Sequence, residues 1–191
     1  MDDKFRNKYR IPSARAQWWD YGWNGAYFIT ICTAHRKHFF GEIVDGKMNL
    51  SPVGVMADIF WHEIRSHTQF VELGDFVVMP NHIHGILILD KPEIVPGTDT
   101  VETLHATSLQ ATSPPKNEQM AKISPKADSV SVILRSYKSA VTKHANRLGF
   151  ENGWQTRFHD HIIRDDAEYQ RIADYIANNP GNWRDDKFYG P

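Results

Sequence analysis

The stretch VVMPNHIHGILIL, residues 77–89, decides how this chain of 191 residues folds. Its apolar residues run almost without a break, which indicates a buried β-strand, and Pro80-Asn81 interrupts the run. Side chains alternate between the two faces of a strand, so His82 and His84 project from one face and Ile83 from the other. The sequence therefore predicts two imidazoles side by side on one face of a buried sheet.

The rest of the chain alternates between strand and helix patterns. Further strands are predicted at 26–33, 75–79 and within 154–164, with a hairpin at 38–51 that turns at Asp45-Gly46. Helices are predicted at 53–66, at 129–148, and from Asp165 or Asp166 to Asn178 or Asn179. This order predicts an α+β fold, in which an antiparallel sheet has helices packed on one face and leaves the other face free for a site.

Composition predicts one folded domain over residues 1–191. Apolar residues make up 41% of the chain and aromatic residues 12%, and the length is sufficient for a hydrophobic core. The single cysteine, Cys32, excludes an internal disulfide and a cysteine-rich zinc site, and it fits a reducing cytoplasm. No apolar run approaches ~18 residues, so neither a membrane span nor a membrane partner is expected.

Two segments differ from this globular pattern. In the arm 1–20, five basic residues and no acidic one lie between Lys4 and Arg15, with aromatic residues close by. Cations beside aromatic rings suit phosphates and unstacked bases, although a solvated arm has the same composition. Residues 91–127 contain five of the ten prolines and many Ser and Thr, which predicts a flexible insertion.

The histidine pair predicts a metal or catalytic site. Imidazole is a common ligand of divalent cations, but two ligands are too few, so a third must come from elsewhere. The pattern leaves two sources open. His159 and His161 would complete a four-histidine cluster suited to hydrolysis. Alternatively, Tyr175 and Asn179 share a face of the last helix because they are four residues apart, and Asn179 offers a carboxamide oxygen.

Other basic side chains qualify as contacts for phosphate groups. Candidates for phosphate contacts are Arg10, Arg15, Lys138, Arg157, Arg164 and Arg171. Exposed basic residues also commonly just solvate a surface. Tyr137 lies on the apolar stripe of the helix predicted at 129–148. We therefore expect Tyr137 in the core.

Three motifs together resemble the single-tyrosine HUH transposases, and most closely their REP-associated tyrosine transposase branch. They are MPNHIHG at 79–85, WQTRFHDHIIRDDAEYQRIADYIANNP at 154–180 and YFITICTAHRKHFFG at 27–41. The resemblance covers most of the chain outside 91–127. It implies a ferredoxin-like (RRM-like) α+β domain.

The resemblance also implies a chemistry. His82 and His84 would bind Mg²⁺ or Mn²⁺, and Asn179 stands where the family places a third, polar ligand. Tyr175 would attack a phosphodiester of single-stranded or hairpin DNA and leave a 5′-phosphotyrosine and a free 3′-hydroxyl. Tyr137 is the rival of Tyr175 as the nucleophile, but its predicted place in the core favours Tyr175. The family commonly acts as a homodimer, which we expect here too. Two alternatives are a DNA-hairpin-binding protein without strand transfer and the histidine-ligated hydrolase.

Overall fold

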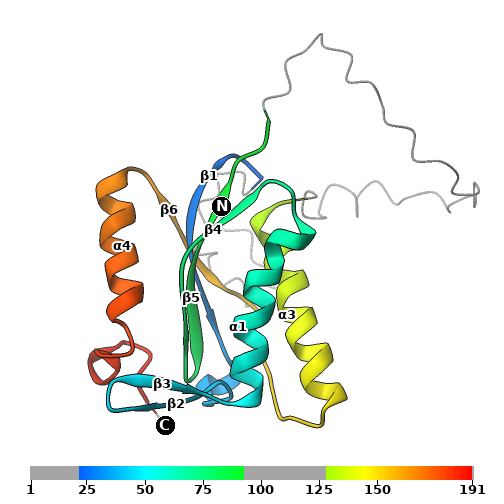
Figure 1. The fold of residues 1–191 in the computed structure, drawn as a ribbon, viewed down its shortest axis with the longest axis vertical. Coiled ribbons are helices and arrows are strands. Elements are labelled where there is room, and N and C mark those ends of the chain that lie inside the picture. The colour runs from blue at the N-terminus through cyan, green and yellow to red at the C-terminus, as the bar shows by residue number, and fades with distance from the viewer. Residues whose placement is uncertain (1–21, 93–127, 191) are drawn as a thin grey trace, which may run out of the picture.

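The computed structural model describes residues 22–92 and 128–190 (Figure 1). The basic arm 1–20, with Arg10 and Arg15, and all but the first two residues of the insertion predicted at 91–127 lie outside the described residues.

Four strands form one antiparallel sheet in the order β4-β5-β1-β6 (Figure 1). They are β1 (Gly25–Cys32), β4 (Val71–Met79), β5 (His82–Leu89) and β6 (His159–Ile163). The helix α1 (Pro52–His67) lies between β1 and β4 in the chain, and α3 (Val130–Arg147) lies between β5 and β6. Two interleaved βαβ units with this strand order make a ferredoxin-like sheet, which confirms the predicted α+β class.

The helices α1 and α3 pack on one face of the sheet (Figure 1). The buried side of α1 is anchored by Trp61, which lies over Gly85 of β5 and stacks on Phe76 with 4.6 Å between ring centroids. A Cβ atom on Gly85 would lie 2.3 Å from Trp61 Cζ2, so only glycine allows this close approach. Helix α1 begins after Ser51, whose hydroxyl accepts a hydrogen bond from the Gly54 amide at 3.0 Å.

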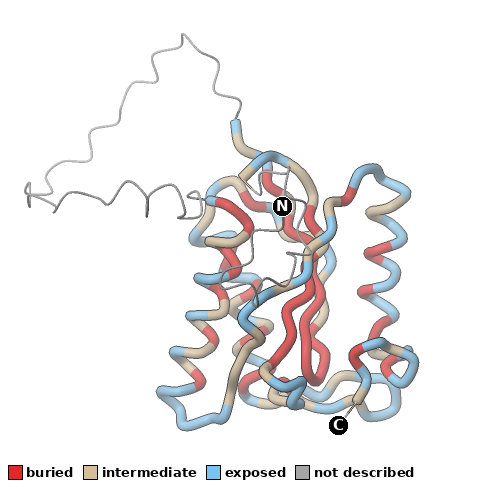
Figure 2. The backbone as a smooth tube through the Cα atoms, turned by 180° about the vertical axis from the view of Figure 1, so that it is seen from behind, coloured by how far each residue is buried: buried red, intermediate tan, exposed pale blue. Residues whose placement is uncertain are grey.

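The helix α4 (Asp166–Asn178) lies on the opposite face of the sheet, so the helices do not all share one face (Figure 1). It packs Ile172 and Ile176 against Ile86 of β5 and Ile163 of β6. The Asp165 side chain caps its first turn by accepting from the Glu168 amide at 2.8 Å. The face expected to be free is therefore covered in part, and the central strand β5 is buried along almost its whole length (Figure 2).

A separate two-stranded hairpin precedes α1. It consists of β2 (Gly41–Val44) and β3 (Lys47–Leu50), joined at Asp45-Gly46 as predicted. Both turn residues have positive φ angles, 50° and 72°, which the tight turn of a hairpin requires. Over the part of the chain that the structure describes, no helix combines the length and apolarity that crossing a membrane would require.

Candidate metal and tyrosine site

The two histidines lie at the start of β5 and point away from α1 and α3. Ile83 between them belongs to the core under those helices, and alternation places both imidazoles on the opposite face. His82 pairs with Cys32 of β1 and His84 with Thr30. Both side chains are fully buried, and their Nε2 atoms lie 3.1 Å apart. The strand pattern read from the sequence thus brings the two imidazoles into contact.

Hydrogen bonds behind the rings orient both imidazoles. The Asn81 amide nitrogen donates to the Phe188 carbonyl at 2.9 Å, so Asn81 Oδ1 is free to accept from His82 Nδ1, 2.9 Å away. His82 Nε2 then carries a lone pair toward the space shared with His84. On the other ring, His84 Nδ1 lies 2.8 Å from the Thr30 hydroxyl, which can donate or accept. Such outer contacts are what positions a metal-binding histidine.

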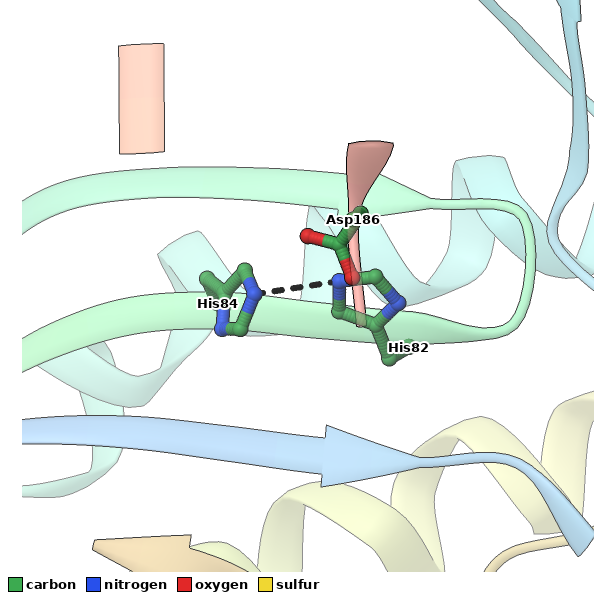
Figure 3. Close-up of side chains that lie close together, drawn as sticks. All are labelled: His82, His84 and Asp186. Atoms are coloured by element: carbon green, nitrogen blue, oxygen red, sulfur yellow. Dashed lines mark hydrogen bonds between the residues drawn. The ribbon is translucent and has the colours of Figure 1, made fainter. Parts of the chain in front are cut away.

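Asp186 lies beside the two imidazoles as a third possible ligand, and it comes from a distant part of the chain (Figure 3). It follows the short 3-10 helix η3 (Trp183–Asp185), and each of the three residues offers a ligand atom within 4.8 Å of the others. Its Oδ1 accepts from the Phe188 amide at 2.6 Å and its Oδ2 from the Asn179 amide at 3.0 Å. The sequence patterns did not indicate Asp186 as a site residue. The available signal was a carboxylate within an aromatic-rich stretch, between Trp183 and Phe188.

Tyr175, in the last turns of α4, lies beside His84 and Asp186. Its hydroxyl lies 3.2 Å from His84 Nε2 and donates to Asp186 Oδ2 at 3.1 Å. Its ring meets Phe28 edge-on and remains 40% exposed. The rival Tyr137 is buried and donates to the Ala57 carbonyl at 2.8 Å, as a core residue would. The phenolic oxygen of Tyr175 is thus within hydrogen-bond distance of both an imidazole and a carboxylate.

Asn179, one turn after Tyr175, is buried beside Asp186. Its amide nitrogen donates to Asp186 Oδ2, whereas its Oδ1 is buried and has no hydrogen-bond partner among the described residues. An orphaned carbonyl-type oxygen of this kind costs free energy unless a donor or a cation meets it. Asn179 therefore stands next to the cluster with an oxygen still available.

The two imidazoles are held in the neutral form. Burial lowers the pKa of His82 to about 4; the Asp186 carboxylate opposes this shift, and the cations of Lys187 and Arg36 add to it. Burial, together with His82 and Lys187, holds the pKa of His84 well below its usual range. Neutral imidazole is the form that binds a metal ion, so near pH 7 both rings are ready to do so.

The phenol of Tyr175 is held in its protonated form. Burial, the Asp186 charge and the hydrogen bond to Asp186 raise its pKa to about 12, and a hydrogen bond from Asn179 opposes the rise. The phenol therefore stays protonated near neutral pH. It becomes more acidic if the charge of Asp186 is neutralised.

The donor set fits a divalent cation. An octahedral Mg²⁺ ion with ligands at about 2.0–2.1 Å has adjacent ligands about 3 Å apart, close to the observed distance between the Nε2 atoms. The carboxylate of Asp186 and the orphaned oxygen of Asn179 are the oxygen ligands that Mg²⁺ and Mn²⁺ prefer. A hollow of about 80 Å³ lies alongside, lined by Tyr175, Asn179, Asn182, Asp185 and Asp186.

The second His-X-His pair does not join this cluster. His159 and His161 share its face of the sheet, but they lie on β6, with β1 between them and β5. His161 Nε2 instead meets Glu168 Oε1 at 2.8 Å. Over residues 22–92 and 128–190, the histidine and acidic groups able to hold a metal are His82, His84 and Asp186. The four-histidine cluster is therefore not formed, because β6 pairs with β1 rather than with β5.

The described candidates for DNA contacts occupy different settings. Lys138 donates to the Gln155 carbonyl at 2.6 Å and lies over the Trp154 ring, so it is tied to the protein. Arg171 pairs with Glu168 at 3.2 Å. Arg157 and Arg164 are exposed. None of these four belongs to the cluster around Tyr175, and a role in binding DNA remains a prediction for each.

Comparison with known proteins agrees with this architecture. The structure of a REP-associated tyrosine transposase bound to a REP hairpin aligns with 87% of this chain and 73% of its own, with a TM-score of 0.51 and 20% sequence identity. The two proteins therefore share their fold. No family model matches the chain. An uncharacterized protein of Haemophilus influenzae is 33% identical over 178 residues, 93% of this chain and 92% of that protein. The chain belongs to the same family as this Haemophilus protein.

Proposed function

We propose that this protein is a metal-dependent tyrosine transposase that nicks and rejoins single-stranded DNA at a hairpin. One observation carries the proposal: the hydroxyl of Tyr175 lies 3.2 Å from His84 Nε2 and 3.1 Å from Asp186 Oδ2. A protonated tyrosine is a weak nucleophile, and here it stands against a proton acceptor and a pair of neutral imidazoles. A tyrosine with a purely structural role, such as the buried Tyr137, needs neither a proton acceptor nor imidazoles beside its hydroxyl.

In the proposed reaction, Asp186 and Tyr175 have different roles. Asp186 orients the Tyr175 hydroxyl and offers an oxygen to accept its proton. As the phenolic oxygen attacks phosphorus, the Oη–P bond forms and the bond from phosphorus to the 3′-oxygen breaks. The 3′-oxygen leaves and takes up a proton from solvent. The 5′-phosphotyrosine conserves the energy of the ester, so a 3′-hydroxyl can reverse the reaction without a nucleotide cofactor.

His82, His84 and Asp186 would hold Mg²⁺ or Mn²⁺, with Asn179 available as a further oxygen ligand. Such an ion supplies a Lewis acid that polarises the phosphate oxygens, an effect worth several kcal/mol. The chain itself contributes rigid placement. His84 is held by Thr30 and His82 by Asn81, and Tyr175 is carried on a helix packed against the same sheet.

The test is incubation with Mn²⁺ and a DNA hairpin that has a single-stranded flank, followed by a denaturing gel. We expect a protein-linked DNA band that disappears in Tyr175→Phe. The matched control is Tyr169→Phe on the same helix, where the hydroxyl meets Asp75 rather than the cluster. Retention of the band in Tyr175→Phe would assign the nucleophile elsewhere. Binding without any band in the wild-type protein would favour a hairpin-binding protein that lacks strand transfer.

A further inference from the structure

Beside the histidine pair lies a patch of cations and aromatic rings that the proposed chemistry does not use. Its members are Arg36, His38, Trp183, Lys187, Phe188 and Tyr189. Phe188 connects the patch to the site, because its ring lies 4.5 Å from the ring of His82, centroid to centroid. We propose that this patch binds the single-stranded DNA next to the scissile phosphate. The proposal rests on the proposed function for its choice of ligand.

Two cations flank the Phe188 ring. The Arg36 guanidinium carbon lies 5.1 Å and the Lys187 ammonium nitrogen 4.8 Å from the ring centroid, and Arg36 Nη1 donates to the Lys187 carbonyl at 3.2 Å. Neither side chain makes an ion pair with a carboxylate of the described residues. Four of the five guanidinium N–H groups of Arg36 therefore remain for a ligand. Two unpaired cations one ring away from the site suit the phosphates of a nucleic acid backbone.

The backbone is distorted where it presents Arg36. His35 and Arg36, in the 3-10 turn η2 (Ala34–Arg36), have φ angles of 53° and 56°, which residues with a side chain seldom adopt. Thr33 fastens the turn, because its hydroxyl lies within hydrogen-bond distance of the Lys37 and Asn81 carbonyls, at 2.7 and 3.0 Å. The turn is thus tied to the residue that orients His82. Unfavourable backbone of this kind is typical of ligand-binding segments.

Exposed aromatic surface accompanies the cations. Tyr189 is 54% exposed and rests edge-on against Trp183, with ring centroids 5.4 Å apart. His38 meets the same Trp183 ring and also bonds the Gly190 carbonyl at 2.8 Å, which holds the segment in place. A supported but exposed ring beside unpaired cations is the combination on which unstacked bases bind. Duplex DNA offers no free base faces, so the arrangement favours a single strand.

The test measures binding of a fluorescent single-stranded oligonucleotide in EDTA, so that no cleavage occurs, over a range of salt. Each phosphate contact on a single strand adds about 0.7 to the slope of log K against log salt, so Arg36→Ala/Lys187→Ala should reduce the slope by about 1.4. The charge-matched control Arg65→Ala/Lys143→Ala lies on α1 and α3, across the sheet, and should keep the wild-type slope. Tyr189→Ala should weaken binding about tenfold with the slope unchanged.

Three outcomes would overturn the proposal: an unchanged slope in the Arg36/Lys187 variant, an equal reduction in the control, or an equal loss of affinity for fully duplex DNA. Arg36→Lys keeps the charge at the distorted position, so its slope should be close to that of the wild-type protein. This variant separates the effect of losing the charge from an effect of misfolding. The result is independent of strand cleavage. If the wild-type protein forms no covalent adduct but the Arg36→Ala/Lys187→Ala variant shows the reduced slope, the proposed function is refuted and this patch is supported. If the wild-type protein forms the adduct but the variant keeps the wild-type slope, the proposed function is supported and this patch is refuted.

Discussion

Lowering the pH from 7.5 to 5 should destabilise this fold, and His82 should account for a definable part of the loss. Its imidazole is fully buried, and its pKa falls from 6.5 to about 4 on folding. Because the folded pKa lies below the unfolded one, the unfolded chain binds the proton more readily. The contribution to stability is therefore complete above pH 6.5 and is lost as the pH falls toward 4.

The expected magnitude follows from these two pKa values. Over the full window the loss from His82 is roughly 3 kcal/mol, and at pH 5 it is roughly 2 kcal/mol. That is a large part of the stability of an ordinary domain, about 5–15 kcal/mol. The pKa of His84 is lowered in the same direction, so its loss adds to that of His82.

Urea unfolding followed by tryptophan fluorescence, in EDTA at pH 7.5, 6 and 5, measures the effect. In His82→Gln, the free energy of unfolding should decrease by roughly 2 kcal/mol less between pH 7.5 and 5 than in the wild-type protein. His67→Gln, at an exposed position on α1, reports any general effect of losing an imidazole. If the wild-type protein and His82→Gln lose the same stability on acidification, the claim that the fold holds His82 neutral is wrong.

Further predictions concern the ligands, their supports and the core. Asp186→Asn should weaken Mn²⁺ binding at least about tenfold by calorimetry, because a neutral amide replaces the carboxylate, and equal affinity would remove Asp186 from the ligand set. Thr30→Val removes the partner of His84 Nδ1 and should weaken Mn²⁺ binding about 10–100-fold, whereas a purely structural role would lower the melting temperature alone. Gly85→Ala should cost about 1–3 kcal/mol in urea unfolding, since its Cβ would lie 2.3 Å from Trp61 Cζ2; an unchanged midpoint would contradict this packing.

Local patterns predicted most of the elements. The helix that begins after Ser51, the turn at Asp45-Gly46 and the strand that carries the histidines all depend on residues close together in the sequence. Their hydrophobic periods, capping groups and turn residues act within a few positions, so each segment carries its own signal. The position of α4 was not predictable in this way, because its apolar stripe shows that it packs on something and does not show on which face.

For the site, the sequence by itself determined that His82 and His84 share a face, since a strand alternates with a period of two whatever surrounds it. Only the tertiary structure decided what meets them. Asp186 follows an irregular turn with no periodicity, and it meets the histidines because the segment after α4 lies beside them (Figure 3). His159 and His161 failed to join for the complementary reason: strand order, which is a property of long-range pairing, placed β1 between the two histidine pairs.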